Sequence, residues 1–131
     1  MSTPFSKTSP VPRVSDRAAA YGMQGVTIDG NNYNEVMETV HAQAENIRSS
    51  SRPVLIEGLT YRYTGHSKSD DCAYRTDEEE QEWRKKDPIK RYKENLVEQS
   101  VSQSDIDAVE KEAADIVEQA VDFARNSPFP E

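Results

Sequence analysis

Two short strand patterns flank one well-marked helix pattern in the first half of the chain. In residues 25–30, Val26 and Ile28 alternate with polar residues between two glycines, the spacing of a short strand. In residues 52–62, the apolar run Val54–Ile56 is typical of a strand buried on both faces. Strand, helix and strand in this order form a βαβ unit with parallel strands. The predicted fold class is therefore α/β, and because two strands alone make no stable parallel sheet, the sequence implies more sheet than it contains.

The helix between the strands has a marked beginning. Asn32 is followed three residues later by Glu35, a candidate capping box in which Asn stands in for Ser or Thr. Apolar residues then recur at spacings that gather on one helical face. These are Val36, Met37, Val40, Ala44 and Ile47. Serines at 49–51 mark the predicted end of the helix.

The chain before the first strand carries weaker patterns. Residues 1–14 hold three prolines among several Ser and Thr residues, which predicts an extended, irregular segment. Residues 15–21 predict one or two helical turns that are capped by Ser15 and stopped at Gly22.

Residues 76–131 are predicted to be helical. Thr76 with Glu79 forms a second candidate capping box, and Asp87–Pro88 predicts the start of the next helix. Ser104 is the predicted cap of the longest helix. Its apolar residues recur at alternating spacings of three and four: Ile106, Val109, Ala113, Ile116, Ala120 and Phe123. A stripe this narrow suits packing against one neighbouring helix, and we expect the helices to pack on the same domain as residues 15–75.

Charge and composition exclude several classes of protein. A net charge of −8 without any Lys/Arg cluster argues against nucleic acid or an acidic membrane surface as the main partner. The single Cys72 excludes an internal disulfide framework and a cysteine-based zinc site within one chain. No run approaches the length of a transmembrane helix, and no signal-peptide pattern opens the chain. We expect a soluble, cytoplasmic protein.

A polar loop over residues 63–75 follows the second strand. It is longer than usual for a connection between a strand and a helix, and it leaves the carboxyl end of a parallel strand, where open α/β sheets bind ligands. Gly65 lets the backbone turn sharply or approach a ligand. His66 can exchange a proton near neutral pH or hold an anionic oxygen. The loop therefore contains candidate site residues.

The charged residues around this loop suit a phosphate group. Arg62, Lys68 and Arg75 supply positive charge, while Asp70 and Asp71 can tether these cations. The alternative is a solvated loop held by its own salt bridges. Metal binding is the weaker interpretation, because one His and two adjacent Asp residues have no recognisable ligand spacing. Composition alone leaves the site and the solvated loop open.

The order of motifs along the chain resembles a known family. "LIEGLTYRYTGHSKSDD", "YRT" and "EEEQEWRKKDPI" resemble the C-terminal part of the alpha subunit of thiamine-diphosphate-dependent 2-oxoacid dehydrogenases. This family contains the decarboxylating components of the pyruvate, branched-chain 2-oxoacid and acetoin dehydrogenase complexes. Upstream, "STPFSK" and "SDRAAAYGMQGVTIDGNN" match its connecting stretch, and "FARNSPFPE" matches its usual ending. The resemblance is collinear over essentially all 131 residues.

The resemblance implies a fold and a role for the 63–75 loop. Residues 15–75 would be the βαβ half of a thiamine-diphosphate-binding parallel-sheet domain, followed by a C-terminal helical segment. His66 matches the catalytic histidine that lies over the cofactor's diphosphate and takes part in passing the acyl group to a lipoyl arm. Ser67 matches a serine that mitochondrial relatives phosphorylate to switch the enzyme off. The residues that match those ordering the loop are Arg62, Asp70, Tyr74 and Arg75.

The resemblance also implies a cofactor and partners, with one departure. The family binds thiamine diphosphate and magnesium through a G-D-G motif that ends in an N-N pair, and this chain lacks both in the expected place. We therefore expect a fragment of a larger subunit, inactive alone, whose magnesium ligands lie outside this segment. The implied partners are a beta subunit in an alpha2-beta2 hetero-oligomer and the lipoyl domain of an acyltransferase. In a eukaryote the location would be the mitochondrial matrix. The alternative is a non-catalytic piece that serves only subunit interaction.

Overall fold

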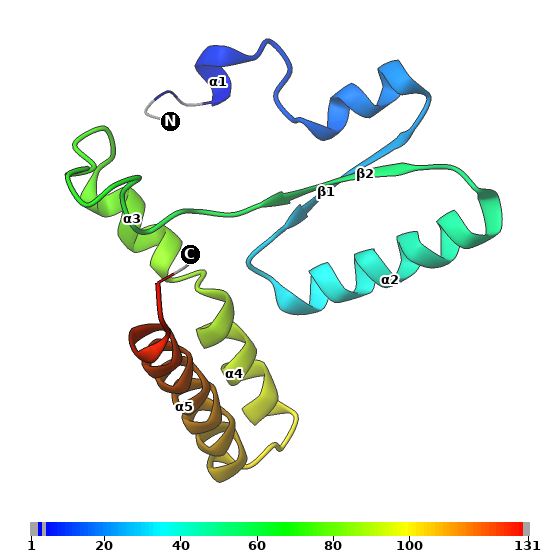
Figure 1. Ribbon diagram of the computed structural model, residues 1–131. Helices are drawn as coiled ribbons and strands as arrows, with labels where there is room; N and C mark the ends of the chain where they lie inside the picture. The colour runs from blue at the N-terminus through cyan, green and yellow to red at the C-terminus, as the bar shows by residue number, and fades with distance from the viewer. Residues whose placement is uncertain (1–2, 4, 130–131) are drawn as a thin grey trace. The chain divides into compact units, whose positions relative to one another are not determined.

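The computed structural model describes residues 3 and 5–129 (Figure 1). These residues form two compact units, one through Tyr92 and one from Lys93 onward. The helices and strands of the chain, in order, are α1 (Phe5–Thr8), the 3₁₀ helix η1 (Ser15–Tyr21), β1 (Gln24–Asp29), α2 (Tyr33–Ser50), β2 (Val54–Leu59), α3 (Asp77–Arg84), α4 (Pro88–Glu98) and α5 (Gln103–Asn126).

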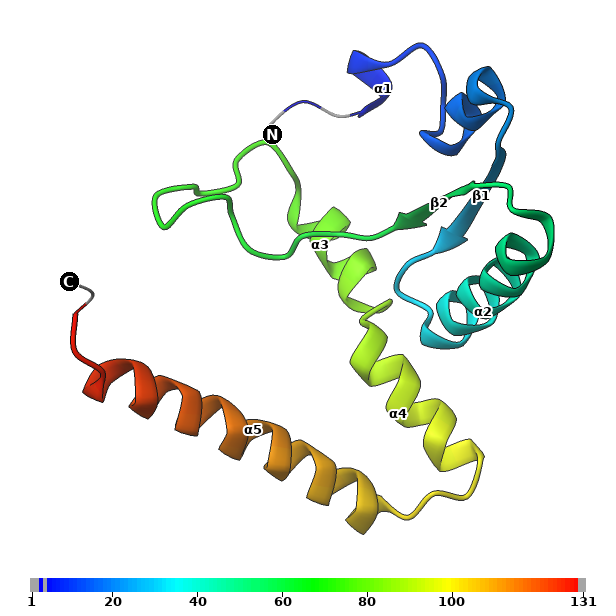
Figure 2. The same ribbon diagram turned by 45° about the vertical axis from the view of Figure 1, so that its right-hand side comes forward.

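The first unit is built around a parallel strand pair. β1 and β2 run side by side, with Gln24 opposite Val54 and Asp29 opposite Leu59, and α2 makes the crossover between them. This confirms the predicted βαβ unit and the α/β class. In Figures 1 and 2, η1 and α2 lie on opposite sides of the strand pair. The alternation of side chains along β1 agrees, because Thr27 bonds to Ser15 of η1, and the next residue, Ile28, whose side chain points to the opposite face, is buried.

The short helix η1 is attached to the strands by polar contacts. The Ser15 hydroxyl lies 2.6 Å from that of Thr27, and the Ser15 N–H donates to Glu57 at 3.1 Å. Ser15 is thus a buried anchor, and its predicted role as a helix cap is wrong: Val14 precedes the first turn and no side chain caps it. The close approach also explains Gly25, where an added Cβ would lie 2.2 Å from the Ser15 carbonyl oxygen.

The predicted boundaries of η1 and α2 are otherwise confirmed. Gly22 ends η1 in the left-handed conformation, with φ of 65°. The Asn32 side chain accepts from the Glu35 N–H at 3.4 Å. Only half of the capping box forms, because the Glu35 carboxylate accepts from the Asp29 N–H instead. α2 ends at Ser50, and the next residue, Ser51, has a φ of 56°.

The hydrophobic core within the described residues is small. The buried hydrophobic residues there are Ala18, Ile28 and Ile106. The prediction that the second strand is buried on both faces is wrong for this chain, since none of β2 is fully buried. On α2, Met37 and Val40 are about half exposed. Two strands and their short helices leave these side chains without enough cover, as expected if further sheet is required.

Two other expectations need correction. Residues 1–14 do not form a wholly irregular segment, because one helical turn spans Phe5–Thr8; residues 1, 2 and 4 lie outside the described part. The cap of α5 is Ser102, not Ser104: the Ser102 hydroxyl accepts from the Asp105 N–H at 3.2 Å. Ser104 lies inside the first helical turn, where its hydroxyl is 2.8 Å from that of Ser102.

The start of the helical segment agrees with its prediction. The Thr76 hydroxyl accepts from the Glu79 N–H at 3.2 Å. The Asp87 carboxylate accepts from the N–H groups of Ile89 and Lys90. The beginning of α4 joins the first unit, because Arg91 pairs with Asp29 at 2.8 Å. Tyr92 extends this contact, with its ring 4.3 Å from that of Tyr33.

The second unit contains the rest of α4 and the long helix α5. Ile106 is buried, and Lys93 forms an ion pair with Glu110. Farther along α5 the predicted stripe is uncovered, with Val109, Ile116 and Phe123 between 59% and 76% exposed. That the helices after Lys93 pack on the βαβ unit stays a prediction.

Candidate functional site: the loop after β2

The 63–75 loop begins beyond the carboxyl end of β2 and returns to the start of α3. In Figures 1 and 2 the green segment runs away from the strand pair before it reaches this helix. The predicted position of the loop, at the ligand-binding edge of a parallel sheet, therefore agrees with the structure. Its conformation depends on two side chains, Asp70 and Arg75.

Asp70 organises the interior of the loop. One carboxylate oxygen accepts from the His66 N–H at 2.8 Å and the Tyr74 hydroxyl at 3.1 Å, and the other accepts from the Cys72 N–H at 3.0 Å. The donated N–H groups of His66 and Cys72 hold the pKa of the Asp70 carboxyl below its usual value. Gly65 permits this fold, since an added Cβ would lie 2.6 Å from the Asp70 carbonyl oxygen.

Arg75 joins the two ends of the loop. Its guanidinium donates to the carbonyl of Arg62 at 2.6 Å and to that of Tyr63, and it pairs with Glu80 of α3 at 3.1 Å. The side chain is only 10% exposed. Its Nε–H is buried without a hydrogen-bond partner among the described residues. A nearly buried cation that reaches two carbonyls fixes where the loop begins.

Aromatic rings complete this junction. The Arg75 guanidinium lies 5.4 Å from the Tyr61 ring centroid, and Tyr61 stacks on Trp83 with centroids 5.2 Å apart and planes within 10°. Burial, followed by the hydrogen bond to Glu79, raises the pKa of the Tyr61 hydroxyl. We call Tyr61, Arg75, Glu80 and Trp83 together the loop base. Cation–π and stacking contacts of this kind add to the hydrogen bonds.

Tyr74 and Cys72 lie between the base and the interior of the loop. The Tyr74 hydroxyl is 3.8 Å from the Cys72 sulfur, and hydrogen bonds to Cys72 and Asp70 raise the pKa of Tyr74 to about 12. The phenol therefore stays protonated and donates to Asp70 at neutral pH. Cys72 is half-buried, with a φ of 58°. Its N–H donates to Asp70 at 3.0 Å.

Residues 66–69 form the loop tip, which is exposed. The His66 backbone N–H is bonded to Asp70, while its imidazole has no hydrogen-bond partner within the described part of the chain. The Ser67 hydroxyl lies 3.1 Å from that of Ser69. Lys68 is also exposed. The tip thus presents a histidine, two hydroxyls and an amine to solvent on a backbone that is fixed from behind.

The structure brings most of the predicted site residues together. Asp70, Tyr74 and Arg75 make side-chain bonds within the loop, whereas Arg62 contributes only its carbonyl and keeps an exposed side chain. Sequence reasoning missed the anionic partners on α3, Glu79 and Glu80. The cap at Thr76 sets the register of α3, so a signal was present in the first helical turn.

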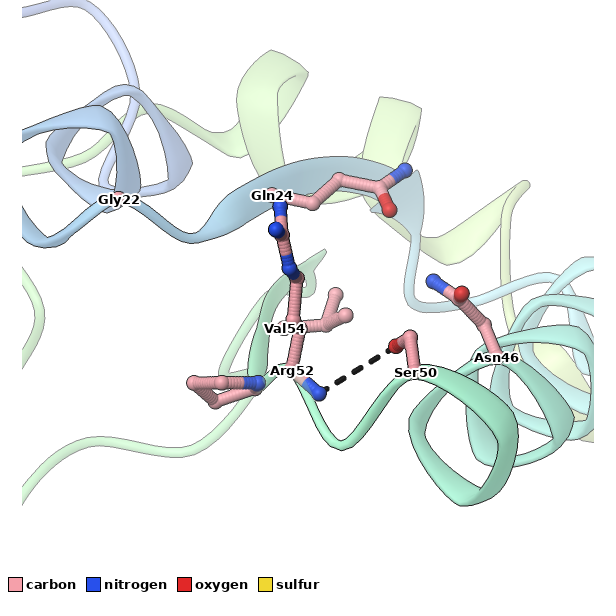
Figure 3. A pocket seen from close by; sticks show the side chains of 7 residues that line it. Gly22, Gln24, Asn46, Ser50, Arg52 and Val54 are labelled. Atoms are coloured by element: carbon pink, nitrogen blue, oxygen red, sulfur yellow. Dashed lines mark hydrogen bonds between the residues drawn. The ribbon is translucent and has the colours of Figure 1, made fainter.

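A hollow lies at the amino ends of the strands, the ends opposite to the 63–75 loop. It has a volume of about 190 Å³, and the Arg52 N–H donates to the Ser50 hydroxyl at its edge (Figure 3). Its lining residues are Gly22, Gln24, Asn46, Ser50, Arg52, Pro53 and Val54. The hollow is at the amino ends of β1 and β2 and is separate from the loop.

The described residues contain neither a metal-ligand cluster nor a membrane-spanning helix. No group of three or more His, Cys, Asp and Glu side chains there is placed to hold a metal ion. None of the helices over these residues combines the length and apolar character needed to cross a membrane.

Comparison with known proteins decides the family. The model of the dehydrogenase E1 component family matches residues 1–131. The chain belongs to this family. The resemblance to this family that the sequence motifs indicated is therefore confirmed over the whole chain. The 63–75 loop lies within the matched residues.

The relatives of this E1 chain are alpha subunits. It is 32% identical over its full length to the pyruvate dehydrogenase E1 component subunit alpha of Rickettsia conorii, and 39% identical over 98% of its length to the 2-oxoisovalerate dehydrogenase subunit alpha of Bacillus subtilis. The Rhizobium meliloti pyruvate dehydrogenase subunit is 35% identical over 100% of the chain. The chain spans about 40% of the length of the first two relatives and 38% of the third.

Proposed function

We propose that this chain forms the loop-bearing, C-terminal part of an alpha subunit that decarboxylates a 2-oxoacid and passes the acyl group to a lipoyl domain. Membership of the E1 family and the alpha-subunit relatives support the reaction class. The substrate stays open between pyruvate, branched-chain 2-oxoacids and acetoin. The alternative remains a non-catalytic piece that only binds other subunits.

The observation that carries this proposal is the exposed imidazole of His66 on a backbone held from behind. Asp70 fixes the His66 N–H at 2.8 Å, and no hydrogen bond within the described residues holds the ring. A catalytic group must reach its reactant without first breaking another bond, and it gains from a fixed backbone. A purely solvated loop would not need this arrangement.

The loop fits an anionic cofactor such as thiamine diphosphate. Arg62, just before the loop, and Lys68, at its tip, have exposed cationic side chains, and these are donors suited to phosphate oxygens. When bound, thiamine diphosphate supplies the carbanion chemistry of decarboxylation. Ligands for its magnesium ion belong, in this proposal, to residues outside this segment of the subunit.

His66 has two chemical tasks in this proposal. Its ring holds an anionic oxygen of the diphosphate, and it exchanges a proton during acyl handover to the lipoyl group. An imidazole suits both tasks because its ordinary pKa lies close to neutral pH. Asp70, Tyr74 and Arg75 act through the backbone and position the ring without touching the reactants.

Ser67 is a proposed site of phosphorylation that would switch the loop off. Its hydroxyl is exposed, and the Ser67 carbonyl accepts from the Asp70 N–H at 3.1 Å. A phosphate there adds a charge of about −2 next to the Asp70 carboxylate. Repulsion between these anions would disturb the bonds that order the loop.

The partners in this proposal are a beta subunit in an alpha2-beta2 assembly and the lipoyl domain of an acyltransferase. The alpha-subunit names of the relatives support a multi-subunit enzyme. The exposed row of Val109, Ile116 and Phe123 on α5 is apolar surface of the kind that subunit contacts cover. The proposed location is the cytoplasm, or the mitochondrial matrix in a eukaryote.

Calorimetry with thiamine diphosphate and Mg²⁺ tests the proposed function. The chain alone should show no measurable binding, whereas the chain combined with the N-terminal part of an alpha subunit and a beta subunit should bind. Tight binding by the chain alone would contradict the placement of the magnesium ligands. No binding by the combined proteins would favour the non-catalytic alternative.

A further inference from the structure

Glu80 divides its carboxylate between two arginines. One oxygen pairs with Arg75 at 3.1 Å, and the other accepts from Arg84 at 2.9 Å and 2.5 Å. The three side chains differ in cover: that of Arg75 is 10% exposed, that of Glu80 26% and that of Arg84 58%. The bond from Arg84, and then the charges of both arginines, lower the pKa of the Glu80 carboxyl. Glu80 is therefore an anion at neutral pH.

The two bonds of Glu80 have different structural consequences. Its bond to Arg84 joins residues one turn apart within α3, a local contact that stabilises the helix slightly. Its bond to Arg75 connects the helix to the guanidinium that also holds the carbonyls of Arg62 and Tyr63. Through Arg75, a carboxylate on α3 thus reaches both ends of the 63–75 loop.

We propose that Glu80 is a positioning residue that holds the 63–75 loop closed through Arg75, with one carboxylate oxygen on Arg75 while the other binds Arg84. The cover of the side chains supports this division, because a bond to a nearly buried cation is screened less by water and salt than one to an exposed cation. The closing role stands on these contacts alone. Its effect on catalysis rests on the proposed function, in which His66 acts from the loop tip.

The main alternative is that Glu80 only stabilises α3. The structure offers variants that separate the two roles. Glu80→Gln removes the charge from both bonds. Arg84→Lys gives up the forked bond to Glu80 but keeps a cation near the Tyr63 ring, which now lies 4.9 Å from the Arg84 guanidinium. Glu82→Gln is the matched control, since Glu82 lies on the same helix and pairs only with the exposed Lys85 among the described residues.

Limited trypsin cleavage of the full chain measures how firmly the loop backbone is held. The Lys68 side chain is exposed at the tip, but the backbone must open locally before the protease can cut it. Cleavage after Lys68 is followed by mass spectrometry. Since proteolysis tracks the open population when closing is fast, Glu80→Gln should be cleaved about three to ten times faster than wild type. Glu82→Gln should match wild type. Arg84→Lys should be cleaved at about the wild-type rate, because the Glu80 oxygen that pairs with Arg75 is not the one that Arg84 binds.

Three results would overturn the proposal. The first is wild-type cleavage of Glu80→Gln. The second is faster cleavage of Arg84→Lys to the same degree as Glu80→Gln, which is the outcome for a helix stabiliser. The third is equally rapid cleavage of all four proteins, which would show that the loop is not held closed. None of these results depends on cofactor or activity.

A separate arm tests the catalytic consequence in the assembled enzyme. With a beta subunit and the rest of the alpha subunit present, Glu80→Gln should lower lipoyl-dependent turnover about three- to tenfold, in step with loop opening. Glu82→Gln should leave turnover unchanged. Faster cleavage with unchanged turnover would retain the closing role and remove the loop from the reaction, so the two proposals fail separately.

Discussion

The base and the tip of the 63–75 loop differ in the burial and bonding of their side chains. At the base, a cation only 10% exposed holds two backbone carbonyls and lies against the stacked rings of Tyr61 and Trp83. At the tip, the side chains of His66 and Lys68 are exposed. Asp70 lies between them and accepts from the backbone N–H groups of His66 and Cys72. The comparison shows that order and reactivity are assigned to different residues, so each can be removed without the other.

The largest expected effect comes from removing the His66 imidazole while leaving the bonds that order the loop intact. In the reconstituted enzyme, His66→Ala should lower lipoyl-dependent turnover by about 10²–10⁴-fold, the range for a positioned proton-transfer group. Steady-state assays with free lipoyl domain measure the loss. His41→Ala, on the exposed face of α2, is the control and should leave turnover unchanged. Wild-type turnover by His66→Ala would remove this histidine from the mechanism.

Removing the Arg75 bonds that hold the base of the loop should have the next largest effect. Arg75→Met eliminates bonds from a charged donor to the carbonyls of Arg62 and Tyr63, each of which stabilises by about 1.5–3 kcal/mol. Amide hydrogen exchange in residues 62–75 should therefore accelerate by roughly 10–100-fold. Arg62→Met removes an exposed side chain but keeps the Arg62 backbone carbonyl that accepts from Arg75. This variant should leave exchange unchanged. Equal effects of the two variants would contradict the role of the base.

A smaller effect is expected where the loop interior is tightest. Gly65→Ala would place a Cβ 2.6 Å from the Asp70 carbonyl oxygen, so the backbone must shift at a cost of roughly 1–3 kcal/mol. The Asp70 amide bonds to the Ser67 carbonyl, and its hydrogen exchange should become faster in Gly65→Ala. Gly58→Ala is the matched control, because its nearest neighbour would be 3.6 Å away. Slow exchange in both variants would mean that the loop accommodates the methyl group.

The smallest effect should come from acid. The folded pKa of Asp70 lies below its ordinary value of 3.8, so its contribution to loop order is complete above that value and is lost as the pH falls through the lowered pKa. The amide chemical shifts of His66 and Cys72 should follow a single titration with a midpoint below 3.8. Asp70→Asn should abolish that titration. A midpoint at or above 3.8 in the wild type would contradict the bonds assigned to Asp70.

Much of this architecture could be predicted from local patterns. The strand alternation at Val26 and Ile28 and the caps at Asn32 and Thr76 each depend on residues only a few positions apart. The position of the loop followed from the direction of a parallel strand. Ser104 was predicted as the cap of α5, but the cap is Ser102: sequence spacing does not separate two nearby serines, and the bonded Asp105 N–H does.

The remaining features depend on contacts that sequence spacing does not encode. Ser15 looked like a cap, but its partners Thr27 and Glu57 come from both strands. Glu80 lay in an acidic run that any helix start would favour. Its contact with Arg75 depends on how the chain turns at Cys72, whose positive φ has no marker in the sequence. The catalytic role of His66 and the phosphorylation of Ser67 stay predictions.

The stacking of Trp83 on Tyr61 has a practical consequence, because Trp83 is the single tryptophan of the chain. Its indole ring lies in the loop base against Tyr61, with the Lys86 ammonium 4.9 Å from the ring centroid. The emission of this one fluorophore therefore comes from the loop base itself. Tryptophan fluorescence of the unlabelled chain can follow changes at that position.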